Sequence, residues 1–116
     1  MNEESVSMYT NHDGTVLVSG KSEVGRVARY IAHLVEKGVE PIDVFFIGAN
    51  AGQQAYKACA VATIICEEKM EKKLAFLTVR AKTKTEKRDI TGKVDLTEGE
   101  LTLVVKDAFI WRVIIL

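Results

Sequence analysis

The sequence is poor in proline, cysteine, histidine and aromatic residues, and its charges balance. Among 116 residues there are one proline, two cysteines and two histidines, and aromatic residues account for 7%. Neither cysteine has metal-ligand spacing to a histidine or to the other cysteine, so we expect no metal site. No apolar run approaches the roughly 20 residues of a membrane span. The polar, acidic N-terminus shows no signal peptide, so we expect no membrane association.

The two cysteines bear on the cellular compartment. If Cys59 and Cys66 lie on one helix, they are two turns apart, about 10 Å along its axis. A disulfide needs Cα atoms within roughly 7 Å, so the two thiols should not bond to each other. We therefore expect reduced, buried cysteines and a cytoplasmic protein.

The sequence does have the composition of a globular domain. Hydrophobic residues make up 47% and charged residues 28%, and the length suits one domain with its own core. We predict a flexible polar tail over residues 1–14 and a single domain over residues 15–116.

Hydrophobic periodicity predicts the elements of this domain. We expect helices over residues 23–37 and 51–68, and strands over residues 15–19, 42–48, 72–82, 101–105 and 108–116. Ser22 and Asn50 should cap the two helices, and Gly38 should end the first. Small residues form the buried stripe of the second helix, whereas Val61 and Ile64 lie off this stripe and suit a second buried surface such as a dimer contact.

The order of elements predicts an α/β fold, a two-layer sandwich of β-α-β-α-β-β type with an extra C-terminal strand. A right-handed crossover between the first two strands would place both helices on one face of a mixed sheet. The other face of that sheet must be solvated or covered by a partner.

The segment "IGANAGQQAYKACAVA", residues 47–62, raises the question of a phosphate-binding turn. Gly48 and Gly52 form only a G-x-x-x-G pattern, whereas dinucleotide and P-loop fingerprints need further glycines or a G-K-S/T sequence. We interpret the segment as a turn in which glycines permit a sharp reversal and alanines permit close packing. No nucleophile with a base partner is visible either, so we expect no enzyme, catalytic residue or cofactor.

Positive charge gathers in one part of the chain. Residues 69–93 contain nine lysines and arginines against three acidic residues, a net charge of +6. Arg80, Lys82 and Lys84 alternate with uncharged residues, so they would share one face of an extended arm. Such an arm could follow a phosphate backbone, or it could be a soluble hairpin whose charges protect a sheet edge. Charge alone favours neither reading.

A longer stretch resembles a known family. "VLVSGKSEVGRVARYIAHLVEKGVEPIDVFFIGANAGQQAYKACAVA" is similar to the stage V sporulation protein S family, which shares the fold of the Alba chromatin proteins. The resemblance lies in the strand leading into a Gly-Lys-Ser turn, the helix ending in "EKG", and the strand running into "IGA" and spaced alanines. It covers residues 16–62 well and the remainder in outline.

The resemblance implies a dimeric α/β sandwich that binds nucleic acid. In Alba-like proteins the first turn supplies a lysine, here Lys21, and the hairpin between the third and fourth strands reaches along the duplex. This chain departs at the start of the second helix, where Ala51, Gln53 and Gln54 stand in place of arginines and Lys57 is the only cation on that helix near the turn. The candidate contact residues are Lys21, Gln53, Lys57, Arg80, Lys82, Lys84, Lys87, Arg88 and Lys93.

Two hypotheses follow. The first is a non-enzymatic, homodimeric or higher-order nucleic-acid-binding protein of the cytoplasm or nucleoid, related to sporulation and chromatin proteins, that contacts DNA or RNA through phosphates with low sequence specificity. The alternative is a regulatory protein-interaction module without nucleic-acid binding. The features that favour the alternative are the missing arginines, the neutral overall charge, and the apolar residues Val61, Ile64 and "FIWRVIIL" that are available for partners.

Overall fold

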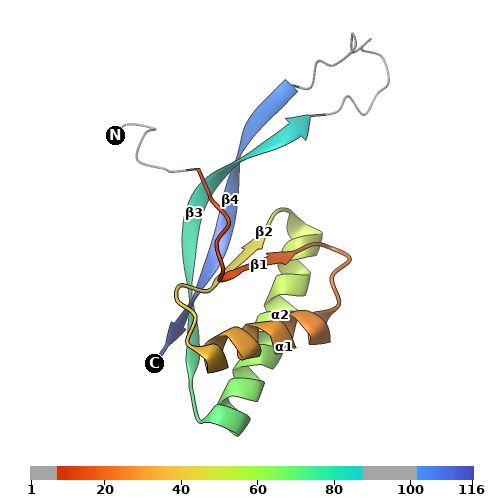
Figure 1. The fold of residues 1–116 in the computed structure, drawn as a ribbon. Helices are drawn as coiled ribbons and strands as arrows, with labels where there is room; N and C mark the ends of the chain where they lie inside the picture. Colours follow the sequence, from red (N-terminus) through yellow and green to blue (C-terminus); the bar gives the residue numbers. More distant parts are fainter. Residues whose placement is uncertain (1–7, 88–101) are drawn as a thin grey trace.

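The computed structural model describes the backbone of residues 8–87 and 102–116, and the side chains of residues 8–83 and 108–116. These residues form two helices and four strands (Figure 1). The elements are β1 (Thr15–Val18), α1 (Val24–Lys37), β2 (Asp43–Phe46), α2 (Ala49–Met70), β3 (Leu74–Lys87) and β4 (Thr102–Ile115). None of the helices in this described part is long and apolar enough to cross a membrane.

The strands form one mixed sheet in the order β1-β2-β4-β3. β1 pairs with β2 in parallel, and β4 lies antiparallel to both β2 and β3. The C-terminal ends of β1, β2 and β3 therefore lie toward the same end of the sheet. The predicted α/β two-layer class is confirmed.

Helix α1 agrees with its predicted span, but its N-terminus is capped differently. Its buried stripe consists of Ala28, Ile31, Ala32, Leu34 and Val35, and it ends at Gly38 in the left-handed conformation, with φ of 74°. The N-cap position belongs to Glu23, whose side chain makes no capping bond. The predicted cap, Ser22, instead accepts a hydrogen bond from the backbone N–H of Ser19 at 2.9 Å. The hydroxyl closes the preceding turn and is not available to the helix.

Helix α2 begins earlier than predicted. Gly48, with φ of 89°, holds the N-cap position without a side-chain bond, so Asn50 lies inside the first turn and does not cap the helix. Glycine suits this position because a positive φ strains residues that carry a Cβ. The buried stripe is made of small residues, Ala51, Ala55, Ala58, Cys59, Ala62 and Cys66. Both cysteines are buried and unpaired, as expected.

The predicted C-terminal strand is present and is continuous with the strand predicted just before it. Residues 102–115 form one strand, β4, and Lys106 and Asp107 stay in register with Thr83 and Lys82 of β3. The polar pair was expected to separate two strands. In an antiparallel ladder, however, backbone hydrogen bonds continue through charged residues that do not bend the chain.

One face of the sheet packs on the helices. Val16 and Val18 of β1, Val44 of β2, Leu74 of β3 and Val113 of β4 belong to the same core as the buried stripes of α1 and α2. Side chains alternate between the faces of a strand, so the intervening residues lie on the opposite face, where no helix packs. There Leu17 and Leu77 are more than half exposed.

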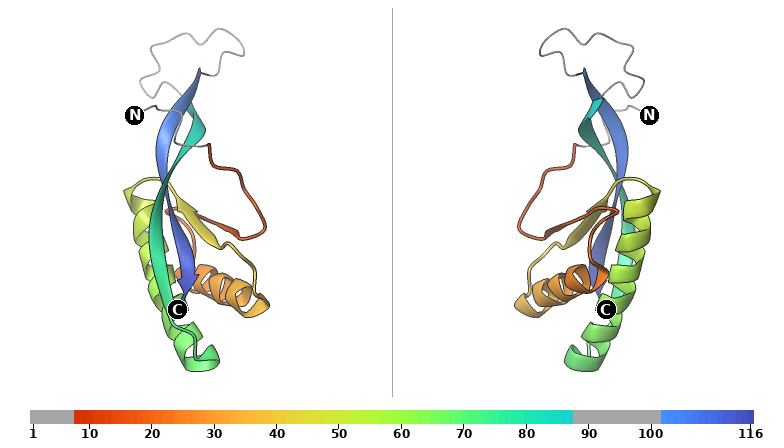
Figure 2. Two further views of the ribbon diagram at one scale, coloured as in Figure 1. Left: turned by 90° about the vertical axis from the view of Figure 1, so that its left-hand side faces the viewer. Right: turned by 90° about the vertical axis from the view of Figure 1, so that its right-hand side faces the viewer.

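The N-terminal segment before β1 differs from the predicted flexible tail. Residues 1–7 lie outside the described residues, but residues 8–14 run from β3 to β1 (Figures 1 and 2). The backbone N–H of Tyr9 donates to the carbonyl of Lys82, and the tyrosine ring stacks on Phe45 with 4.9 Å between ring centroids. We call residues 8–14 the strap.

Candidate functional site

The turn after β1 holds Lys21 at an exposed corner. Gly20 in this turn lies so close to the start of α2 that an added Cβ would come within 2.9 Å of Asn50. The side-chain amide of Gln54 donates to the carbonyl of Ser22 at 2.8 Å and ties the turn to the helix. Lys21 is thus exposed on a well-anchored loop, and its backbone N–H donates to the hydroxyl of Ser19.

The start of α2 lies beside this corner. Residues from both segments, including Ser19, Lys21, Gly48 and Asn50, line an open hollow of about 670 Å³ at the ends of β1 and β2. The first turn of α2 has no side-chain cap, so its N–H groups and the helix dipole favour an anion there. Gln53 and Lys57 are exposed and lie one turn apart on the same helix face.

The long strands carry the remaining candidate residues. Arg80 pairs with Phe109, which pairs with Phe46 at the end of β2, so everything beyond Arg80 extends past the body. We call residues 81–87 and 102–108 the arm. Its seven residues on β3 span about 23 Å at the usual rise of a strand. Figures 1 and 2 show β3 and β4 continuing beyond both helices.

Two of the predicted cations on these strands, Arg80 and Lys82, have side chains that the structure describes. Arg80 is exposed and engages another residue, while Lys82 is half-buried at the base of the arm. Arg80 and Lys82 hold alternate positions on β3 and therefore lie on the same face of this strand. The side chains of Lys84 and Lys87, as well as Arg88 and Lys93 as a whole, lie outside the described residues.

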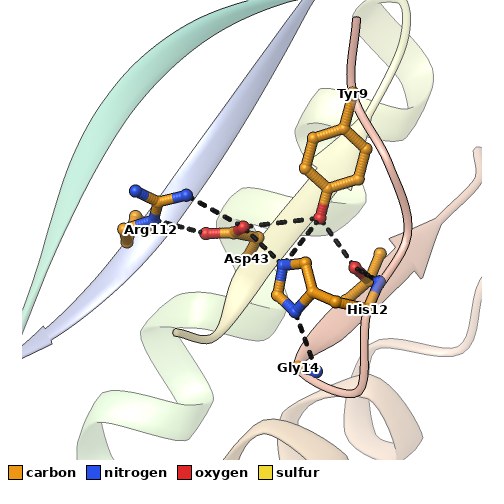
Figure 3. Close-up of polar contacts among 6 residues, drawn as sticks. Tyr9, His12, Gly14, Asp43 and Arg112 are labelled. Atoms are coloured by element: carbon orange, nitrogen blue, oxygen red, sulfur yellow. Dashed lines mark hydrogen bonds and ion pairs between the residues drawn. The ribbon is translucent and has the colours of Figure 1, made fainter. Parts of the chain in front are cut away.

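A second polar cluster, which the sequence reading missed, surrounds a buried carboxylate on the face of the sheet opposite the helices (Figure 3). The side chain of Asp43 is 1% exposed. Arg112 donates to it twice, from Nε to Oδ1 at 2.8 Å and from Nη2 to Oδ2 at 3.2 Å. His12 Nε2 lies 2.8 Å from Oδ2, and the hydroxyl of Tyr9 donates to the same oxygen at 3.4 Å.

The contacts of His12 select one tautomer. The backbone N–H of Gly14 donates to His12 Nδ1 at 3.1 Å, so Nδ1 acts as an acceptor. A neutral imidazole with its proton on Nε2 then donates to Asp43 and satisfies both nitrogens. The backbone N–H of His12 donates to the hydroxyl of Thr15 at 2.9 Å, which also lies 2.7 Å from the hydroxyl of Tyr9. Strap and sheet are therefore joined by a closed network.

Opposing effects set the pKa values in this cluster. Burial would raise the pKa of Asp43, but the hydrogen bonds from Arg112 and His12 and the charge of Arg112 outweigh burial and lower it below its ordinary value. The hydrogen bonds that Arg112 donates to Asp43 raise the pKa of Arg112. Burial raises the pKa of Tyr9, and the nearby carboxylate adds to this rise. Asp43 is consequently an anion at neutral pH, held by a cation that is 40% exposed.

The sequence contained one signal for this network. Asp43 is the one charged residue of β2, and Arg112 is the one charged residue of the apolar segment 108–116. The two charges are of opposite sign, and buried charges require partners. Asp43 pairs directly with Arg112 in the β2–β4 register. No comparable signal marked Tyr9 and His12, since both lie in a polar segment without periodicity.

An open pocket of about 810 Å³ adjoins the cluster. Its lining carries the cations Arg80 and Arg112 and the anions Asp13, Glu40 and Asp43, so its charge selects neither anions nor cations. Within the described residues, no group of three or more histidine, cysteine or acidic side chains is arranged to hold a metal ion. The contacts of Asp43 with Arg112, His12 and Tyr9 are thus those of an ion pair that stabilises the fold.

Comparison with known proteins adds no assignment. No protein-family model matches the chain, and no curated protein aligns with it significantly.

Proposed function

We propose that this protein binds nucleic acid without catalysing a reaction, and that it contacts the phosphate backbone with low sequence specificity. The observation that carries the proposal is the common direction of three features. All three lie at the end of the sheet that holds the C-terminal ends of β1, β2 and β3: the Lys21 turn, the uncapped start of α2, and the arm. Cations and helix N-termini are the groups that bind phosphates.

Phosphate contacts explain the residue types at this end of the molecule. Lysines act as point charges toward phosphate oxygens, and Gln53 offers an amide that donates to phosphate or sugar oxygens. The arm supplies a two-stranded ribbon of the kind that follows a groove or backbone. The resemblance of residues 16–62 to the sporulation and Alba proteins supports the same function, located in the cytoplasm and associated with the nucleoid.

The test is binding of a fluorescein-labelled 20-base-pair duplex, as DNA and as RNA, followed by anisotropy at 50 and 200 mM salt. We expect affinity to fall as salt rises, because each neutralised phosphate releases condensed counterions. Lys21→Glu should weaken binding by tenfold or more. Binding of the wild-type protein that does not respond to salt, or no binding at 50 mM, would overturn the proposal.

Lys69→Glu is the matched control. Lys69 is an exposed residue near the end of α2, about 24 Å along the helix axis from Gln53. Both substitutions lower the net charge by two, so a general charge effect would weaken binding equally. Weaker binding by Lys21→Glu alone identifies the corner as a contact.

We further propose that the binding species is a homodimer. Tyr56, Val61 and Ile64 are 65%, 37% and 54% exposed along α2, and exposed apolar side chains that share one helix can form a contact surface between two copies of the chain. Ile64→Glu should shift the protein toward the monomer in sedimentation equilibrium. An unchanged mass would place the dimer contact elsewhere or exclude it.

One observation favours a second candidate, a protein-interaction module. Leu77, Ile114 and Leu116 are exposed hydrophobic residues on or beside the sheet, away from the corner and the arm. Reversing Lys84, Lys87 and Arg88 to glutamate separates the two functions. Loss of nucleic-acid binding with unchanged capture of protein partners would assign the arm to nucleic acid and the apolar residues to proteins.

A further inference from the structure

The strap contacts the base of the arm. The backbone N–H of Tyr9 donates to the carbonyl of Lys82 at 2.8 Å, and Met8 forms a parallel bridge with Lys82. Lys82 lies two residues beyond Arg80, where β3 leaves the body of the sheet. The strap thus pairs with the edge of β3 that β4 does not occupy.

The same strap is attached to the body of the sheet. The ring of Tyr9 stacks on Phe45 of β2, and its hydroxyl lies 2.7 Å from that of Thr15 on β1. Three residues later, His12 contacts the buried carboxylate of Asp43 at 2.8 Å. Tyr9 therefore joins the arm to β1 and β2 through one residue.

A ribbon of two strands has little stiffness of its own beyond the sheet that supports it. Its direction is set by twist unless a third element holds it. The strap is such an element, because it adds a contact at the base of the arm and anchors that contact to two other strands.

We infer that the strap is a positioning device that fixes the direction of the arm relative to the Lys21 corner. Tyr9 and His12 then affect nucleic-acid affinity without touching the nucleic acid. This inference rests on the proposed function for its effect on affinity, but the effect on arm direction is independent of any ligand.

The first experiment measures arm direction in the full chain. Spin labels on Glu36→Cys and Lys87→Cys report the distance between α1 and the arm, and the native thiols are buried and do not compete for the label. Labelled chain is diluted into excess unlabelled protein so that distances within one chain dominate. Tyr9→Ala should broaden the distance distribution, whereas Asn11→Ala, an exposed residue of the same strap, should leave it unchanged.

A second variant leaves the strap sequence intact. Thr15→Val removes the hydroxyl that holds both Tyr9 and the backbone of His12 and keeps a β-branched residue in the strand. It should broaden the distribution as Tyr9→Ala does. This variant keeps the test valid if Tyr9→Ala does not fold.

The second experiment measures affinity for the 20-base-pair duplex at 50 mM salt. Tyr9→Ala and Thr15→Val should each weaken binding about five- to tenfold. This is the effect expected when the strap loses one hydrogen bond or one aromatic contact to the sheet and holds the arm less firmly. Asn11→Ala should bind as the wild type does.

The outcomes separate the inference from the proposed function. An unchanged distance distribution in both folded variants overturns the inference, whatever the affinity. A broadened distribution with unchanged affinity overturns the role of the strap in binding. If the wild-type protein does not bind nucleic acid, the proposed function fails, and a broadened distribution still supports the strap as the element that directs the arm.

Discussion

At the scale of single residues, Asp43 connects the most distant parts of the chain. It receives hydrogen bonds from Arg112 near the C-terminus and from His12 in the strap, and its own backbone N–H donates to the carbonyl of Gly14 at 2.9 Å. A buried carboxylate is tolerated because, among the described residues, each buried side-chain nitrogen or oxygen has a hydrogen-bond partner. Removing the carboxylate takes away an acceptor shared by Arg112, His12 and Tyr9.

Asp43→Asn should therefore destabilise the protein by about 1–3 kcal/mol at pH 6, since an amide group turns N–H donors toward the donors of Arg112 or His12. The effect should depend on pH. Asp43 has a lowered pKa in the folded state, so its stabilisation is present above the ordinary value of 3.8 and is lost as the pH falls through the folded-state pKa. Urea unfolding at pH 6 and pH 3 measures this.

The difference in unfolding free energy between the wild type and Asp43→Asn should be smaller at pH 3 than at pH 6, because protonation of Asp43 removes its stabilisation. The other carboxyl groups titrate equally in both proteins and do not affect this difference. An equal gap at the two pH values would mean that Asp43 does not provide the expected pH dependence.

The buried thiols give a second prediction at this scale. Burial raises the pKa of Cys59 to about 12, and burial also raises that of Cys66. Since the thiolate is the reactive form, Cys59 in the native protein at pH 8 should react with Ellman's reagent about a thousandfold more slowly than in the unfolded protein, and Cys66 should also react more slowly. Absorbance at 412 nm follows the reaction. Rapid labelling of both thiols without denaturant would contradict the buried positions.

At the scale of elements, helix α2 depends on small side chains. Ala55, Ala58 and Ala62 are 0% exposed, and they lie in the core that α2 shares with α1 and the sheet. The start of α2 lies against the Gly20 turn and forms the corner that holds Lys21.

Ala58→Leu should destabilise the protein by about 1–3 kcal/mol, because three added carbon atoms have no space around a fully buried residue of the core. Ala60→Leu is the control, since Ala60 lies on the exposed side of the same helix. Both variants replace alanine by leucine, so the change in helix propensity is the same. Chemical denaturation of the two variants measures the difference. Equal stability of the two variants would show that the helix does not pack as closely as described.

At the scale of the whole molecule, the body and the arm have separate roles. The core lies between the helices and one face of the sheet, and the arm extends beyond the core, where β1 and β2 have ended. The arm should therefore contribute to binding and little to stability.

Replacing residues 84–105 by Asn-Gly tests this separation, because Thr83 and Lys106 face each other in register and a two-residue turn can join them. The unfolding free energy should change by less than about 1 kcal/mol, as for surface changes away from the core. Duplex affinity should fall, and the slope of log affinity against log salt should decrease by up to about 3.6, since four cations are removed.

The removed segment carries four basic and five acidic residues, so the shortened chain has a net charge of +1. A loss of binding therefore cannot come from the overall charge. Unchanged affinity and salt slope would exclude the arm as the contact surface.

Much of this fold follows from local patterns. The buried stripes of α1 and α2 and the order of helices and strands along the chain were predicted, because hydrophobic periodicity reports which side of an element faces the core. The caps were predicted less well. Ser22 and Asn50 are good capping residues by type. The hydroxyl of Ser22, however, accepts a hydrogen bond from Ser19, and Gly48 takes the N-cap position of α2, two residues before Asn50.

By itself, the sequence determined the class of fold, the burial of the two thiols and the position of the basic segment along the chain. Each of these depends on residues close together in the sequence. Only the tertiary structure decided that Tyr9, His12, Asp43 and Arg112 meet, and that a polar N-terminal segment lies against the base of the arm. Contacts across 31 to 69 residues depend on sheet register and strand order, which no local pattern specifies.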